Sequence, residues 1–477
     1  MAKLRKQKPA RGPQAAATAE DFAAHSRSET LFSRMLAVRT PRLLRGLEFS
    51  LLLFALALGA GAIMLIDLSI SQNLSAAMLV PGIIYGAITI GLHLVVRLVA
   101  PNADALILPL ATLLNVIGIA MIYRIDLAAG PVDFNSTSIR QIMWAVLAMV
   151  LAGVLMLTLK NHRVLLQYIY LFGALGIVLL LLPLVPGLGF EAGGARQWIH
   201  IGPYSFQPVE IAKIALAIFF AGYLMQNRDA LALVGRKIGP ILLPRGRDLG
   251  PLIVVWAVAM GVLVFQRELG TSVLLLGLFL AMLYVATGRA SWVLLGVTLF
   301  AAGGYAAYRT LPYVQARFDN WLDPFRDAHG ASFQLVQGLF GMANGGVGGT
   351  GLGGGYPQLT PLADSDYIVA SLAEELGFVG VVAVLLAYLL LIARGLRVAF
   401  SGHDDFGRLL AAGLAFTLAL QIFVVIGGVT RVIPLTGLTS PFLAAGGSSL
   451  VSNWLIVALF LLMSNSVRSQ SKLVIRT

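Results

Sequence analysis

Long apolar segments follow one another through almost the whole chain, and no other feature limits the fold more. Polar breaks bound twelve of them, at roughly 47–69, 76–98, 104–123, 138–159, 163–185, 207–226, 250–266, 271–287, 291–308, 367–394, 408–430 and 448–466. A helix of about 17–25 apolar residues crosses the hydrocarbon layer of a bilayer. With 58% hydrophobic and 12% charged residues, the chain cannot bury them all in one soluble core. We predict an all-α, polytopic bundle of about 12 transmembrane helices.

The distribution of basic residues predicts how this bundle is oriented. Residues 1–46 contain ten Lys or Arg against three acidic residues, and they lack the short apolar core of a signal peptide. We interpret them as a disordered cytoplasmic tail beside anionic lipid. Segments 227–249, 395–407 with its flanks and the tail 467–477 then fall on the same side, and all carry basic residues. The positive-inside rule therefore places both termini in the cytoplasm.

Two long polar segments, 186–206 and 309–366, fall on the opposite side of this predicted membrane. Long ordered loops between helices usually carry function. We therefore expect a large extracytoplasmic loop at 309–366 and expect any chemistry to take place outside.

Motifs that are absent, or that stand in the wrong context, argue against several common classes of protein. The run from Gly349 to Gly354 fits G-x-G-x-x-G, but it follows no strand and opens no dinucleotide-binding fold. We interpret it as a loop that lets backbone approach another segment closely. The chain has no G-K-[ST] loop, no H-E-x-x-H pair and no G-x-S-x-G elbow, which argues against an ATP-driven pump, a zinc protease and a serine hydrolase.

Metal and nucleic-acid sites are not expected either. The chain has no cysteine, and His200 and His329 stand alone, so no metal-ligand set forms by spacing. The net charge of +12 comes mostly from short loops between apolar segments, which do not make a nucleic-acid-binding surface.

Ionisable residues within or beside the apolar spans are the best candidates for function, because charges are costly in lipid. Glu210 and Lys213 are i, i+3 neighbours on one helix face and can pair. The pair is either a structural ion pair or part of a site. Asp366 stands just before a span, where it is either a helix N-cap or a general base.

Four stretches of the chain resemble signatures of the SEDS family (shape, elongation, division and sporulation), the RodA/FtsW/SpoVE group. They are Ala195–Lys213, the run from Trp321-Leu-Asp323-Pro324 to Gly355, Asp366–Gly380 and Pro434–Ser449. The chain departs from the family pattern at Arg267-Glu268, where Pro-Asp is common, and at Ala444-Ala445, where Ser-Tyr is common.

The resemblance implies a division of the chain into parts. A ten-helix core would cover 104–466, including the loop 309–366, and 47–98 would be an extra helix pair. The short C-terminal tail is more similar to the cell-elongation branch, RodA, although the sequence leaves a role in elongation or in division open.

The resemblance also implies an inverting peptidoglycan glycosyltransferase that polymerises lipid II on the outer face of the bacterial cytoplasmic membrane, for cell elongation and shape. It implies that Asp366 is the catalytic base. We expect Arg196, Lys213 and then Arg267 to bind the diphosphate leaving group. Further expected substrate-binding residues are Glu210, Gln207, Trp198, Glu375, Ser448 and Ser449.

The expected partner is a class B penicillin-binding protein. No bound metal is expected, and a divalent cation stays open. Two alternatives remain at this point: a lipid II flippase without chemistry, and a non-catalytic scaffold for cell-wall assembly.

Overall fold

The structure, a computed structural model, describes residues 41–470 except 193, 203, 229–234, 239–240, 245 and 403. Most of the two predicted tails lies outside the described residues. The first helix already begins at Pro41 and the last ends at Gln470. Both helices continue a few residues beyond the apolar segments predicted from the sequence, and the division of the chain into tails, extra pair and core stays a prediction.

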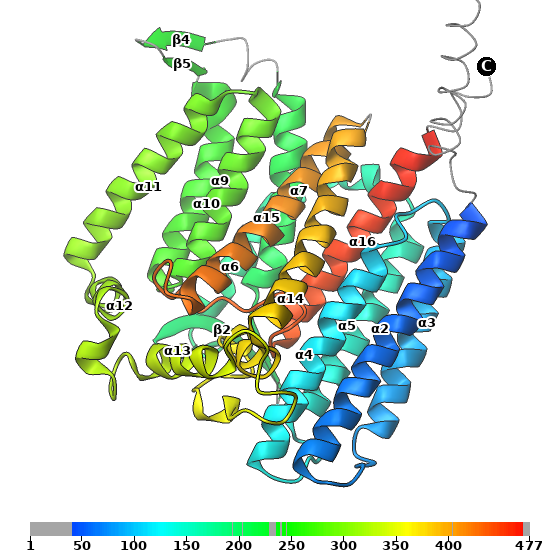
Figure 1. Ribbon diagram of the computed structural model, residues 1–477. Coiled ribbons are helices and arrows are strands. Elements are labelled where there is room, and N and C mark those ends of the chain that lie inside the picture. The colour runs from blue at the N-terminus through cyan, green and yellow to red at the C-terminus, as the bar shows by residue number, and fades with distance from the viewer. Residues whose placement is uncertain are drawn as a thin grey trace, which may run out of the picture.

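The bundle consists of long helices packed side by side, which run alternately up and down (Figure 1). They are α2 (Pro41–Ile70), α3 (Leu79–Val99), α4 (Ile107–Ala129), α5 (Thr137–Leu159), α6 (Ile169–Leu181) with the 3-10 turns η1 (His162–Tyr168) and η2 (Leu182–Leu184), α7 (Val209–Gln226), α9 (Gly246–Phe265), α10 (Leu269–Thr287), α11 (Ala290–Thr310), α14 (Ile368–Ser401), α15 (Asp405–Val429) and α16 (Gly447–Gln470).

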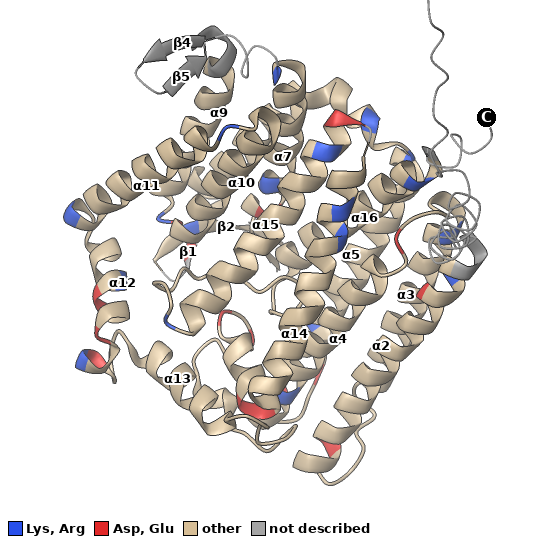
Figure 2. Ribbon diagram, turned by 45° about the horizontal axis from the view of Figure 1, so that its top comes forward, with Lys and Arg blue, Asp and Glu red and all other residues tan. Residues whose placement is uncertain are grey.

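The prediction of about 12 spans is confirmed. Within the described part of the chain, eleven helices are long and apolar enough to cross a membrane, and the shorter apolar helix Gly250–Phe265 within α9 accounts for the twelfth predicted span. Lys, Arg, Asp and Glu are sparse along these helices (Figure 2), as contact with lipid requires.

Helices α4, α7 and α16 form the centre of the bundle, since 83%, 83% and 78% of their most apolar windows are buried. Helix α11 lies at the periphery, where only 6% of its window is buried. Figure 1 shows α11 at one edge of the bundle and the extra pair, α2 and α3, at the other.

The predicted loop 309–366 is largely helical. It contains α12 (Pro312–Leu322), the 3-10 turn η3 (Pro324–Asp327), α13 (Phe333–Gly345) and the 3-10 turn η4 (Pro357–Leu359). These helices are too short or too polar to have appeared as spans. They lie at one end of the bundle, beside β2 (Figure 1).

Two small antiparallel sheets interrupt the all-α architecture. The first joins β1 (Gly189–Ala192), β2 (Ala195–Ile201) and β3 (Tyr204–Phe206), and the second joins β4 (Gly235–Ile238) and β5 (Ile241–Pro244). Hydropathy alone predicts loops at both segments, because these strands are too short to register as spans. The two sheets lie at opposite ends of the bundle (Figure 1).

The first and last helices meet at one end of the bundle. A guanidinium nitrogen of Arg45, near the start of α2, and one of Arg468, near the end of α16, both donate to the carbonyl oxygen of Ala103. This end is opposite to the one that carries α12 and α13 (Figure 1), as an even number of crossings requires.

Candidate active site

Asp366 lies immediately before α14, but it does not cap that helix. The N-cap residue is Tyr367, and no side-chain hydrogen bond caps the helix. The N-cap interpretation of Asp366 is therefore wrong. Among the described residues no group donates a hydrogen bond to its carboxylate, so both oxygens are available to a ligand.

The surroundings of Asp366 make it a stronger base than an ordinary aspartate. Burial, and then the neighbouring Asp364, raise the pKa of Asp366 to about 6, while the charge of Arg317 opposes them. Burial also raises the pKa of Asp364. A carboxyl group with a pKa near the working pH can both accept and release a proton.

The segment before α16, residues 430–446, lies directly against Asp366. A Cβ atom added to Gly437 would lie 3.7 Å from Oδ2 of Asp366, and Gly437 has a φ of +74°. Nearby, the backbone N–H of Ala445 donates to the carbonyl of Asp364 at 2.8 Å. The signature stretches Asp366–Gly380 and Pro434–Ser449 therefore meet at this carboxylate.

Arg317 of α12 ties the helices of the 309–366 region to the same segment. Its Nη1 donates to the carbonyl oxygens of Leu435 at 3.3 Å and Thr436 at 3.1 Å. Its positive charge lowers the pKa of both Asp366 and Glu268. Arg317 was missed in the sequence analysis, and no motif in the sequence singles it out.

Glu268 is a second carboxylate coupled to Asp366. It is buried between α9 and α10, and burial raises its pKa to about 7. Thr271 Oγ1 donates to its Oε1 at 3.1 Å, which opposes that rise, and the charge of Asp366 adds to it. The sequence identified Glu268 only as a departure from the family pattern, whereas in the structure the charge of Asp366 makes a small contribution to its raised pKa.

The two arginines predicted to bind the diphosphate lie on adjoining segments. The backbone N–H of Arg196, in β2, donates to the carbonyl of Gln266 at 3.1 Å, directly before the exposed Arg267. The Cζ of Arg267 lies 5.8 Å from the ring centroid of Tyr313 in α12. The guanidinium of Arg196 is half-buried and, among the described residues, donates a hydrogen bond to the Gly189 carbonyl alone, at 3.5 Å.

Trp198 and Gln207, also predicted to bind substrate, hold the small sheet together and connect it to α16. Trp198 is half-buried in β2 and pairs with Phe190 of β1. The backbone N–H of Gln207 donates to Ser448 Oγ at 3.0 Å, and its side chain donates to Gln197 at 2.7 Å.

Ser448 and Ser449 are both buried. Ser449 Oγ accepts hydrogen bonds from Thr439 Oγ1 at 3.1 Å and from Asn453 Nδ2 at 3.2 Å. These serines therefore connect the start of α16 to the segment beside Asp366.

Glu210 and Lys213 form the predicted ion pair, at 2.6 Å, and both are buried in the bundle. Lys213 also donates to Gln421 Oε1 at 3.1 Å, and the Gln421 amide donates to the Thr439 carbonyl at 2.9 Å. Ser452 donates to Glu210 at 3.1 Å. The network supports the segment next to Asp366 from within the membrane.

Glu375 lies further down α14, where both of its oxygens have protein partners. Its Oε1 accepts from Arg124 Nε at 2.6 Å, and its Oε2 accepts from the backbone of Gly353 at 2.9 Å. A Cβ added to Gly349 would lie 2.2 Å from the Glu375 carbonyl oxygen. The interpretation of this glycine run as a site of close backbone approach is confirmed.

The arrangement combines a carboxylate of raised pKa with two arginines on adjoining segments at the same end of the bundle. This combination suits proton transfer beside a phosphate-bearing substrate. No group of three or more His, Asp or Glu that could hold a metal ion occurs among the described residues.

Comparison with known proteins places this arrangement in a family. Residues 104–469 match the FtsW/RodA/SpoVE family model, described as cell cycle protein. The chain belongs to this family. It is a multi-pass membrane protein of the FtsW/RodA/SpoVE family, and the matched region begins after α3.

Relatives in this family carry names that agree with the resemblance. The chain is 42% identical over 427 residues to peptidoglycan glycosyltransferase RodA of Mycobacterium tuberculosis (strain ATCC 25618 / H37Rv), covering 89% of this chain and 91% of that protein. It is 32% identical over 377 residues to stage V sporulation protein E of Bacillus subtilis (strain 168), covering 77% and 98%.

Solved structures of the FtsW/RodA/SpoVE family share the fold. One belongs to a study entitled "Structural coordination of polymerization and crosslinking by a peptidoglycan synthase complex"; it has a TM-score of 0.61 and 28% identity and covers 76% of this chain and 98% of that chain. The rod shape determining protein RodA of Thermus thermophilus has a TM-score of 0.54 and 27% identity, covering 76% and 96%.

Proposed function

We propose that the peptidoglycan glycosyltransferase activity that family membership assigns to this chain is the inverting polymerisation of lipid II, with Asp366 as the general base. The observation that carries the proposal is the half-buried Asp366 carboxylate, whose pKa is raised to about 6 and which has no hydrogen-bond donor among the described residues.

In the proposed reaction, Asp366 takes the proton of the 4-hydroxyl of the acceptor sugar as that oxygen attacks C1 of the donor muramyl sugar. The new C–O bond forms on the face opposite to the diphosphate, the bond from C1 to the diphosphate oxygen breaks, and undecaprenyl diphosphate leaves. Attack from the opposite face inverts the configuration at C1. The energy comes from the activated diphosphate bond, which agrees with the absence of a nucleotide-binding motif from the sequence.

The leaving diphosphate gains negative charge in the transition state and needs positive groups placed in advance. Arg196 and Arg267 suit this role, because they lie on adjoining segments and both are accessible. Arg196 is half-buried and Arg267 is exposed. Lys213 is buried and paired with Glu210, so we assign it a positioning role through Gln421 and the segment before α16. A divalent cation would enter with the diphosphate of the substrate.

We propose that the end of the bundle with Asp366 faces outward from the bacterial cytoplasmic membrane and that both termini are cytoplasmic. The basic segments of the sequence support this orientation. The partner proposed is a class B penicillin-binding protein, which would crosslink the strands; one structural neighbour was studied in a complex that combines polymerisation with crosslinking.

Polymerisation of purified lipid II by the purified full-length chain, with and without the partner, tests the proposal. Asp366→Asn should lower the rate by about 10²–10⁴-fold, the usual loss with a general base. Its thermal stability should stay near that of the wild type, because Asp366 makes no cap. Asp319→Asn, on the exposed part of α12, is the matched control and should polymerise normally. An Asp366→Asn variant of wild-type rate would refute the base assignment and favour a flippase or a scaffold.

A further inference from the structure

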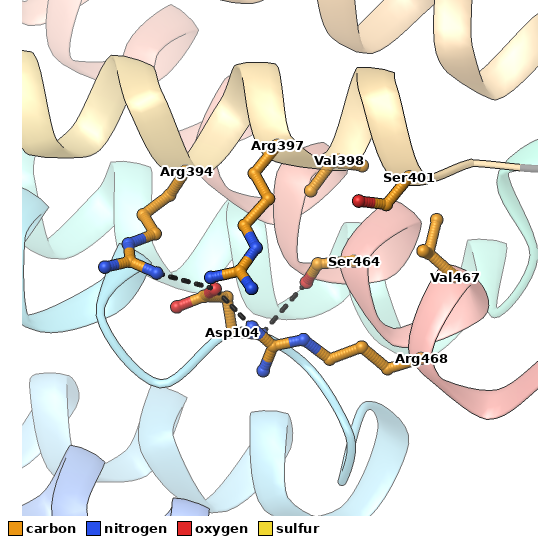
Figure 3. Close-up of a pocket in the computed structure, with 8 residues that line it drawn as sticks. All are labelled: Asp104, Arg394, Arg397, Val398, Ser401, Ser464, Val467 and Arg468. Atoms are coloured by element: carbon orange, nitrogen blue, oxygen red, sulfur yellow. Dashed lines mark hydrogen bonds and ion pairs between the residues drawn. The ribbon is translucent and has the colours of Figure 1, made fainter. Parts of the chain in front are cut away.

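A cavity of about 220 Å³ lies at the end of the bundle remote from Asp366. Three arginines converge on it from two helices, Arg394 and Arg397 from α14 and Arg468 from α16, around the single carboxylate of Asp104 (Figure 3). Ser401 and Ser464 also line it. The mechanism proposed above uses none of these residues.

The cavity carries more positive than negative charge. Asp104 forms an ion pair with Arg468, and its Oδ2 lies 3.9 Å from Nη1 of Arg394. Among the described residues no acidic side chain pairs with Arg397, although Figure 3 shows its guanidinium directed into the same space. One carboxylate therefore faces three guanidinium groups.

Other carboxylates at this end of the bundle have basic partners of their own. Glu48 is paired with Arg45 at 2.5 Å and with His93 at 2.6 Å. Asp404 lies 2.8 Å from His162 and 3.6 Å from Arg163. The excess positive charge in the cavity is therefore not neutralised by these groups.

Neither the orientation rule nor helix capping explains why all three arginines converge, although Arg468 lies in the last turn of α16, where a basic side chain favours the helix end. The positive-inside rule depends on the number of basic residues, not on their meeting at one cavity. Arg394 stands nearly two turns before the end of α14 at Ser401, too far to interact with the last carbonyl groups of that helix.

The chemistry of the cavity fits a phosphate group. Guanidinium groups match phosphate oxygens with paired hydrogen bonds, and the two serine hydroxyls can donate as well. At roughly 30 Å³ for each water in the liquid, the volume accommodates about seven waters, which is enough for a phosphate group.

The depth of the cavity points to a lipid as the source of that phosphate. At ~1.5 Å per residue, α16 extends roughly 32 Å from Gly447, directly after the segment next to Asp366, to Arg468, close to the hydrocarbon thickness of about 30 Å. The arginines therefore lie at headgroup depth in the leaflet opposite to Asp366, where basic pockets between helices suit anionic lipids.

We propose that the cavity formed by Arg394, Arg397 and Arg468 around Asp104 binds the phosphate of an anionic phospholipid headgroup. The bound headgroup bridges α14 and α16 at the ends remote from the candidate active site. The proposal does not depend on the activity at Asp366, and its test does not measure polymerisation.

Native mass spectrometry of the delipidated full-length chain tests this site. Phosphatidylglycerol, phosphatidylcholine and inorganic phosphate are added separately, and lipid adducts and melting temperature are followed. Arg397→Gln should raise the phosphatidylglycerol concentration for half-occupancy by about fivefold, the factor that corresponds to ~1 kcal/mol per basic residue. The wild type should bind phosphatidylcholine much more weakly.

Arg97→Gln is the matched control, because Arg97 is exposed in the last turn of α3 and does not line the cavity. It should leave phosphatidylglycerol binding unchanged. Equal weakening by Arg397→Gln and Arg97→Gln would show general surface attraction and overturn the proposal. Stabilisation by inorganic phosphate equal to that by phosphatidylglycerol would overturn the lipid as the source of the phosphate.

Discussion

The ammonium nitrogen of Lys213 lies 2.6 Å from a carboxylate oxygen of Glu210, one turn earlier on α7, and both side chains are buried. Through Gln421 the pair is connected to the Thr439 carbonyl, in the segment that also contains Gly437 beside Asp366. The ion pair and the candidate base are therefore linked by one piece of backbone.

Lys213→Met should destabilise the protein strongly. Removing one partner leaves the other charge buried and unpaired, which typically costs about 3–5 kcal/mol. The double variant Glu210→Gln/Lys213→Met removes both charges and should recover most of that loss. Thermal or denaturant unfolding in detergent measures both variants. A Lys213→Met variant as stable as the wild type would mean that the pair contributes little to the fold.

The polymerisation rate should fall as the pH drops through about 6, because Asp366 accepts a proton only when it is ionised. Arg317 lowers the pKa of Asp366, so Arg317→Gln should raise that pKa and move the acidic limb of the profile to higher pH. The profile of kcat/KM against pH, measured with purified lipid II, gives the position of this limb.

Arg431→Gln is the control for this shift. Arg431 ties the same segment to α12 through the carbonyls of Trp321 and Leu322, but its charge is not among those that shift the pKa of Asp366. Its loss should lower the rate without moving the limb. An unshifted limb in Arg317→Gln would show that Arg317 acts only by holding the segment in place.

Arg196→Lys should reduce the rate substantially more than His200→Ala, although both residues lie in β2. Lysine keeps the charge and loses the planar fork that binds phosphate oxygens in pairs. His200 stacks on Phe190, with ring centroids 3.9 Å apart, so its loss should affect mainly the small sheet. Steady-state rates with purified lipid II compare the two, and equal effects would assign Arg196 a structural role.

A cysteine at His329 should react with a membrane-impermeant thiol reagent added to intact cells, and a cysteine at Arg163 should not. The chain has no native cysteine, so each label reports a single position. His329 is exposed in the segment between α12 and α13, and Arg163 is exposed in η1 at the other end of the bundle. Labelling at Arg163 in intact cells, with none at His329, would invert the proposed orientation.

The sequence alone determined about how many membrane-spanning helices the chain has and roughly where they lie. Each crossing needs about 20 apolar residues, so hydropathy by itself marks the spans. The pairing of Glu210 with Lys213 was also predictable, because residues at i and i+3 share one face of any helix. The signature stretches identified the family without reference to any contact.

Only the tertiary structure decided which residues surround Asp366. Lipid is as apolar as the interior of the bundle, so hydropathy does not reveal which face of a helix packs against protein. Arg317 stands far from Asp366 in sequence, and its influence on the pKa of Asp366 depends on how α12, α14 and the segment before α16 pack together. For the same reason the structure, and not the spacing of residues, showed that Asp366 does not cap α14: its carboxylate, close to Gly437, is directed to the site by packing between distant segments.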